Sequence, residues 1–282
     1  MRYIYFVCRT EAQRDDASEA RERCATACKR SPMDFYKMVF TEYSGMNSCV
    51  RIPIGATHIG PGAFQRNRYV HEVVIPEGVV EIEDEAFDAC VNLEVVRLPS
   101  TLRRIGRRAF KGCWRIDSIQ LPKELEVIDD QAFLRCRGLN SIELPPSVTA
   151  IGKEAFRNCV CLKSIAFPPC LATVEVGVMR DCMTLEDVSL PSDLEVIEDD
   201  AFNTCPSLVE VSLPPNLGWI GQRAFRACGA LKRINIPAGV RSLEERVFYG
   251  CRVLHDIELH DSIEYVDETA FDPDADPFAE KP

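Results

Sequence analysis

A phenylalanine recurs every 23 residues along most of this chain, and this period constrains the fold more strongly than any other feature. A methionine is the one substitution in the series. Its members are Phe64, Phe87, Phe110, Phe133, Phe156, Met179, Phe202, Phe225, Phe248 and Phe271. A fixed period of this length predicts stacked structural units, because each unit can bury its apolar face only against its neighbours. We therefore expect a solenoid.

Each unit has the same internal pattern, which is most complete over residues 139–159. Ile142 and Leu144 alternate with polar residues, which predicts one short parallel strand per unit, and the proline that follows ends the strand. Gly152 is interpreted as the site of a tight turn. Residues 155–159, with the sequence Ala-Phe-x-x-Cys, are predicted to form one short helical turn whose apolar side chains face inward.

The unit L-x-x-I-x-L-P-x-x-L/V-x-x-I-G-x-x-A-F-x-x-C resembles the consensus of BspA-like leucine-rich repeats over residues 49–271. The resemblance implies an α/β leucine-rich-repeat solenoid that is right-handed, with a parallel β-sheet on the concave face and short helical turns opposite. It also implies a protein-binding or adhesive role without catalysis in the repeats. It names no partner, because one fold can carry many functions.

The regions outside the repeats predict a cap and a tail. Residues 1–48 are interpreted as an N-terminal cap over the open end of the solenoid, with a strand over 3–7 and a helix over 15–28. A functional module in this segment is the alternative. The solenoid itself is assigned to 49–271, and residues 272–282 are interpreted as an acidic tail.

The chain has 14 cysteines, and eight of them follow the repeated phenylalanine position by three residues. They are Cys90, Cys113, Cys136, Cys159, Cys182, Cys205, Cys228 and Cys251. One recurring slot predicts a small buried hydrophobic residue and not a metal or disulfide site. The pair Cys24 and Cys28 has no second pair at zinc-finger spacing. So many unpaired thiols, together with no recognisable secretion signal, lead us to expect a cytoplasmic, reducing location.

Composition and the remaining motifs argue against several function classes. A net charge of −11 disfavours nucleic-acid binding, and no apolar run is long enough for membrane insertion. The four histidines lie in distant units without an obvious catalytic partner, so we expect no catalytic residue and no cofactor. Asp272, Asp274 and Asp276 begin like a calcium loop, but Pro277 stands where glycine is required. We therefore expect no metal site.

The exposed strand positions of the central units carry mostly small residues with charges at the edge, and we predict that a protein partner binds there. The predicted partner-binding residues are Ser118, Ser141, Glu143, Ser164, Ala166, Ser189, Glu210, Ser212 and Arg233. Small side chains admit another backbone closely. Crowding of neighbouring strands is the alternative reason for small residues at these positions.

A basic cluster on two adjacent units is a second candidate surface for an acidic partner. It consists of Arg103, Arg104, Arg107, Arg108, Lys111 and Arg115. The competing interpretation is a solvated face balanced by Glu126, Asp129 and Asp130 of the next unit, because exposed ion pairs are common and individually weak.

Three functions remain compatible with the sequence. We expect an intracellular, non-enzymatic scaffold or assembly subunit that binds a protein partner. A surface-attached adhesin of the BspA-like kind would need an export signal or an anchor. An enzyme hidden in residues 1–48 is the third alternative.

Overall fold

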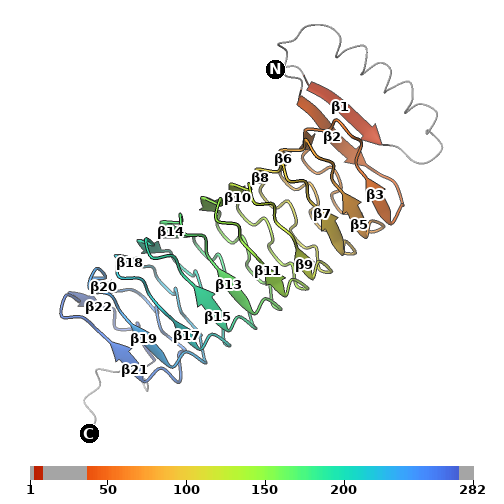
Figure 1. Ribbon diagram of the computed structural model, residues 1–282. Coiled ribbons are helices and arrows are strands. Elements are labelled where there is room, and N and C mark those ends of the chain that lie inside the picture. The colour runs from red at the N-terminus through yellow and green to blue at the C-terminus, as the bar shows by residue number, and fades with distance from the viewer. Residues whose placement is uncertain (1–2, 9–36, 273–282) are drawn as a thin grey trace.

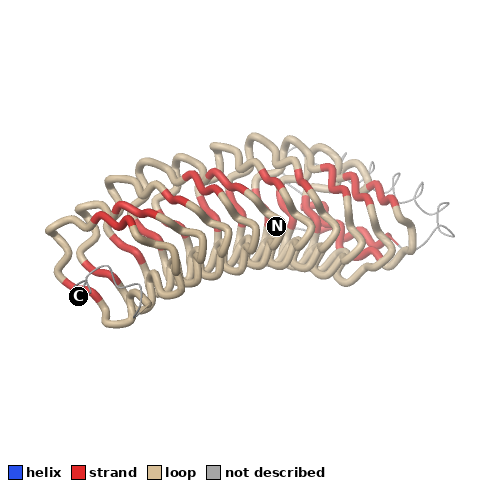
Figure 2. Tube along the Cα trace, turned by 90° about the horizontal axis from the view of Figure 1, so that it is seen from below, coloured by secondary structure: helices blue, strands red, loops and turns tan. Residues whose placement is uncertain are grey.

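The computed structural model describes residues 3–8 and 37–272, and the repeats form a coil that completes one turn per unit (Figure 1). Two sides of each turn carry a short β-strand, and the third side consists of tight turns. The stack of coils curves gently along its length (Figure 2). The predicted solenoid is confirmed.

One β-ribbon is formed by the strands that the sequence pattern predicts, and we call it the first ribbon. Its strands are parallel, and they pair with strands of neighbouring coils in three separate hydrogen-bonded groups. They are β3 (Cys49–Arg51), β5 (Glu72–Val74), β7 (Val95–Arg97), β9 (Ser118–Ile119), β11 (Ser141–Ile142), β13 (Ser164–Ala166), β15 (Asp187–Ser189), β17 (Glu210–Val211), β19 (Arg233–Asn235) and β21 (Asp256–Glu258). The central side chain of each, such as Val50 or Ile165, points into the core.

A second ribbon, in which every strand is only two residues long, was not predicted. Each contains one half-exposed or exposed residue followed, in all but the last strand, by one buried residue, as in Ala150 and Ile151. Its strands are β4 (His58–Ile59), β6 (Glu81–Ile82), β8 (Arg104–Ile105), β10 (Val127–Ile128), β12 (Ala150–Ile151), β14 (Thr173–Val174), β16 (Val196–Ile197), β18 (Trp219–Ile220), β20 (Ser242–Leu243) and β22 (Tyr265–Val266). An expectation of one strand per unit is therefore wrong.

The N-terminal segment extends the second ribbon. Strand β2 (Lys37–Tyr43) pairs in parallel with β4, and β1 (Tyr3–Cys8) pairs in parallel with β2. The predicted strand at the N-terminus is thus confirmed. Phe40 on β2 stacks on Phe64 with ring centroids 5.4 Å apart, so this segment shares the core of the repeats. The helix expected over residues 15–28 and most of the acidic tail lie outside the described residues.

The short helical turns expected at each Ala-Phe-x-x-Cys motif are absent, so the expected α/β class is wrong and the described residues form a β-solenoid. The described ranges, 3–8 and 37–272, contain no helix, and therefore none that could cross a membrane. The third side is built from consecutive tight turns with two residues of positive φ per coil, as at Gln131 (58°) and Arg135 (61°). Backbone N–H groups alternate between two acceptors: Phe133 donates to Ala155 of the next coil at 2.8 Å, whereas Leu134 donates within its own turn.

Coil spacing explains why a helix does not form on the third side. Neighbouring strands of a ribbon lie about 4.7–4.9 Å apart, whereas a helix with its side chains is about 10–12 Å wide. The stacked phenylalanine rings are similarly close, with centroids 4.8 Å apart for Phe64 and Phe87 and 5.7 Å apart for Phe225 and Phe248. Tight turns that donate every second N–H to the next coil fit this spacing, and helices do not.

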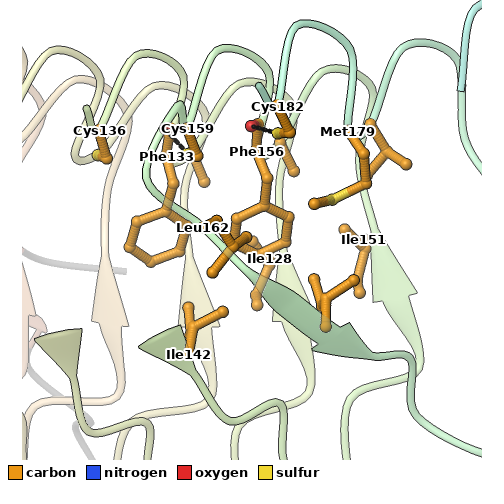
Figure 3. Close-up of a cluster of buried hydrophobic side chains, with 14 of the residues drawn as sticks. Ile128, Phe133, Cys136, Ile142, Ile151, Phe156, Cys159, Leu162, Met179 and Cys182 are labelled. Atoms are coloured by element: carbon orange, nitrogen blue, oxygen red, sulfur yellow. Dashed lines mark hydrogen bonds between the residues drawn. The ribbon is translucent and has the colours of Figure 1, made fainter. Parts of the chain in front are cut away.

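The repeated phenylalanines stack along the core in two runs, one on each side of Met179, and Figure 3 shows Phe133, Phe156 and Met179. Phe133 is fully buried and lies between Phe110 and Phe156, with ring centroids 5.4 Å away on each side. Met179 interrupts the stack. At the break, Phe167, the residue directly after β13, packs edge-on against Phe202, with ring centroids 6.5 Å apart and an interplanar angle of 85°. An aromatic ring from another position of the repeat thus contacts the first phenylalanine after Met179.

The eight repeated cysteines are buried and free, which confirms their predicted place in the core. Each thiol also makes a contact that the sequence did not predict. Cys136 Sγ donates a hydrogen bond to the backbone oxygen of Phe110 in the preceding coil at 3.1 Å, and the same bond recurs at 3.0–3.3 Å from Cys90 to Cys251. Cysteine therefore suits this slot both by its size and by its S–H group.

The repeated Ile-Gly glycine is required by a close approach between coils. A Cβ atom on Gly152 would lie 2.4 Å from Asp130 N and 2.5 Å from Asp130 Oδ1. The Asp130 carboxylate cannot swing aside freely, because it accepts a hydrogen bond from Lys153 N at 2.8 Å. Gly106 and Gly221 stand in the same relation to Asp84 and Asp199.

Replacing Gly152 by alanine is expected to lower the free energy of unfolding by about 1–3 kcal/mol, because the added methyl group meets backbone atoms. Gly229→Ala is the matched control, since a Cβ there meets nothing within 4 Å. It should be neutral or stabilise the chain by up to about 1 kcal/mol, because alanine restricts the unfolded chain. Urea unfolding of both variants checks this. Equal losses in the two variants would contradict the close-approach explanation.

Candidate interaction surface

The outward face of the first ribbon brings the predicted partner-binding residues together. All nine are exposed, and they belong to β9, β11, β13, β15, β17 and β19 or to the residue next to one of these strands. They lie in two parallel columns on either side of the buried column that contains Ile142 and Ile165. We call these two columns, from β9 to β19, the strand-face strip.

Strand register defines the two columns. In the first, Ser118 is aligned with Ser141, and Ser164 is aligned with Asp187 of the next coil. In the second column, Ala166 is aligned with Ser189. Serine and alanine side chains are short, so the middle of the strand-face strip is low and carries hydroxyl groups, with Glu143 and Asp187 as its longer side chains.

Ion pairs bracket this low region. On the N-terminal side, Arg97 Nε lies 2.8 Å from Glu72 Oε1, and this hydrogen bond holds the pKa of the Glu72 carboxyl below its ordinary value. On the C-terminal side, Arg233 Nε lies 3.3 Å from Glu210 Oε2. The central serines therefore lie between two ends that each carry an Arg–Glu ion pair.

The basic cluster proves to be paired with acidic residues. Arg104 contacts Glu81 at 2.5 Å and also Asp129, and Arg115 contacts Glu94 at 2.7 Å. The other members are Arg103 with Glu124 and Glu126, Arg107 with Asp84, Arg108 with Glu85, and Lys111 with Asp88. Most of these partners come from the preceding coil. The pairing favours a balanced, solvated face over a docking site for an acidic partner.

An exposed aromatic hollow on the second ribbon was missed by the sequence analysis. It has a volume of about 610 Å³ and is lined by Asp193, Glu195, Val196, Asn216, Gly218 and Trp219. Trp219, one of two tryptophans in the chain, is 40% exposed. The sequence offers one sign of this hollow: Trp219 stands at a repeat position where other coils have the smaller residues Ala150 and Thr173.

The comparisons agree with the architecture. The model of the BspA type leucine-rich repeat region matches residues 57–186 and 172–274, in six copies. A leucine-rich repeat protein of T. pallidum is 31% identical over 60% of this chain and 82% of its own, with a TM-score of 0.58. A leucine-rich repeat protein of Bacteroides ovatus ATCC 8483 is 27% identical over 81% of this chain and 73% of its own, with a TM-score of 0.63.

No curated protein matches the chain. The family match, in contrast, covers well over half of its length and coincides with the described coils. The recurring phenylalanine, cysteine and strand positions of those coils are the ones on which the resemblance rests. The chain belongs to the family of BspA-type leucine-rich repeat proteins.

Proposed function

We propose that this chain is a non-enzymatic interaction scaffold that binds a segment of a protein partner along the strand-face strip. The observation that carries the proposal is the run of exposed serines on β9, β11 and β13, in which Ser118 and Ser141 are aligned and which lies between two ion-paired ends. Family membership supports a binding role in general, because repeat solenoids present extended surfaces for recognition.

The chemistry of the strand-face strip favours a polypeptide over a small molecule. Ser141 and Ser164 offer hydroxyl groups that can both donate and accept hydrogen bonds, and their small size lets another main chain approach closely. No enclosed cavity of the kind that holds small ligands is part of this surface. Without large aromatic anchors at the centre, the affinity is expected to be moderate. Charged edge residues such as Glu210 would then set the direction of the bound segment.

Replacing Ser141, Ser164 and Ser189 together by arginine should abolish partner binding, because three long charged side chains would fill the low region. Stability should change by no more than about 0.5 kcal/mol per site, since all three side chains are exposed. The partner is first identified by affinity capture with mass spectrometry from the native source. Its affinity for the wild type and for the triple variant is then measured by surface plasmon resonance.

A second triple variant controls for the added charge. Thr149, Ala172 and Ala238 are also exposed but lie outside the first ribbon. Their replacement by arginine adds the same charge and should leave the affinity unchanged. Wild-type affinity in the strand-face variant, or equal losses in the two triple variants, would refute the proposal. The small residues would then be explained by crowding of neighbouring strands.

A further inference from the structure

Three side chains from β4 and β6, two paired strands of the second ribbon, lie close together near the N-terminal end of that ribbon, where Figure 1 labels β6. They are His58 on β4, Glu81 on β6, and Glu83 just after β6. One potential ligand atom from each lies within 4.8 Å of the other two. We propose that His58, Glu81 and Glu83 bind a divalent transition-metal ion of the zinc class. No metal site was expected from the sequence, because the strand pairing that brings these residues together cannot be seen there.

Strand register places the first two ligands. His58 and Glu81 are aligned partners of the parallel β4–β6 pair, so their side chains stand next to each other on the outer face. His58 Nε2 lies 3.6 Å from Glu81 Oε2. Two ligands of a tetrahedral zinc ion, each about 2.0–2.2 Å from the metal, are about 3.3–3.6 Å apart. The observed separation already matches this geometry.

Neighbouring glycines give the third ligand room. The backbone N–H of Glu83 donates to Ile59 O at 2.8 Å, which holds Glu83 beside the end of β4. In the adjoining coils, Gly60 and Gly106 occupy the position of Glu83. No side chain therefore stands on either side of Glu83 in its own column, and one carboxylate oxygen of Glu83 lies within 4.8 Å of the potential ligand atoms of His58 and Glu81.

A hydrogen-bond relay orients the histidine ring. Thr57 Oγ1 accepts a hydrogen bond from Met38 N at 2.9 Å and donates one to Met38 O at 3.1 Å. With its proton on Met38 O, Thr57 Oγ1 can accept a hydrogen bond from His58 Nδ1, 2.9 Å away. In the neutral imidazole, Nε2 then carries the lone pair and faces Glu81. Histidine ligands of metals are commonly held by such a bond from the other ring nitrogen.

The charges around the site also select the kind of ion. Arg104 binds Glu81 through Oε1 at 2.5 Å, which leaves Oε2 on the side of His58 and favours a single carboxylate contact to the metal. The second arm of Arg104 contacts Asp129, so its charge is shared with another carboxylate. One imidazole with two carboxylates suits zinc and its neighbours in the first transition row, whereas calcium and magnesium prefer sites made only of oxygen ligands.

Zinc chloride titrated into the reduced full-length chain tests the proposal by calorimetry. Compared with the wild type, His58→Gln and Glu83→Gln should each lower the affinity for one zinc ion per chain at least tenfold. His255→Gln, which removes an exposed histidine in a distant coil, should bind zinc as the wild type does. The cysteines are the same in all four proteins, so any binding by thiols forms a common background.

Thermal unfolding supplies a second readout. Zinc should raise the melting temperature of the wild type and of His255→Gln more than that of the two site variants, because a ligand of the folded state stabilises it. Thermal melts without zinc show whether each variant folds. If His58→Gln does not fold, the zinc affinity of the nearly isosteric Glu83→Gln variant alone tests the proposal. Zinc isotherms that are the same for Glu83→Gln and the wild type, or an equal loss in His255→Gln, would overturn the proposal. His58, Glu81 and Arg104 would then form only a row of ion pairs.

Discussion

Replacing Phe133 by alanine is expected to lower the free energy of unfolding by about 3–5 kcal/mol, the usual effect of emptying a buried aromatic site. Phe133 is 0% exposed, and its ring contacts both Phe110 and Phe156. The cavity would therefore remove stacking on two sides as well as burial. In a solenoid each coil is stabilised mainly by its neighbours, so the loss weakens both adjoining interfaces.

Phe133→Met is the matched control, because the chain itself uses a methionine at the equivalent position, Met179, which is fully buried. This substitution nearly conserves volume and should cost less than about 1.5 kcal/mol. Urea unfolding followed by circular dichroism measures both variants. If alanine costs no more than methionine, the phenylalanine stack contributes little to stability, and the repeat would be held together mainly by the two ribbons.

Raising the pH from about 9 towards about 11 in the presence of a reductant is expected to unfold the chain. Burial raises the pKa of the Cys90, Cys136 and Cys182 thiols to about 12, compared with an ordinary value of 9.0. The folded-state pKa is thus above the unfolded one. Stability from the neutral thiols is complete below pH 9 and is lost as the pH rises towards 12.

The size of this effect follows from proton linkage. Within that window each such thiol costs about 1.4 kcal/mol of stability per pH unit, so these three together cost about 4 kcal/mol per unit. Burial also raises the thiol pKa of the neighbouring column members, such as Cys113 and Cys159, and this acts in the same direction. Two such units remove about 8 kcal/mol through these three thiols alone, which is comparable to the whole stability of about 5–15 kcal/mol of a typical domain.

Urea midpoints measured from pH 7.5 to 10.5 check this expectation. Cys136→Ser is the control, because a hydroxyl can keep the hydrogen bond to Phe110 O but does not ionise in this range. The stability of this variant should fall less steeply with pH than that of the wild type, and the two slopes should differ by about 1.4 kcal/mol per pH unit. A midpoint that stays constant up to pH 10.5, or a slope that is the same in Cys136→Ser and the wild type, would show that the thiols are not neutral and buried as described.

Repetition in the sequence was sufficient to predict the solenoid, the first ribbon and the buried columns. A residue such as Phe133 or Cys136 that returns every 23 positions must occupy the same place in every coil, whatever the local structure is. The exposed positions of the strand-face strip followed from the two-residue alternation around Ile142, and the structure places those residues on one face.

Local structure on the other two sides could not be derived in the same way. Ala-Phe-x-x-Cys has helical spacing, and only the distance between stacked coils, set by the ribbons, excludes a helix there. The two-residue strands of the second ribbon carry too little alternation to be recognised one at a time.

Contacts between coils are likewise invisible in a single unit. Gly152 is required by Asp130 of the preceding coil, and His58 meets Glu81 only because their strands are aligned. The periodic sequence by itself determined which residues are buried and which family the chain belongs to, since burial of a repeating apolar face needs only stacking. The tertiary structure decided how each turn is built and which polar groups meet, because those depend on the spacing and register of neighbouring coils.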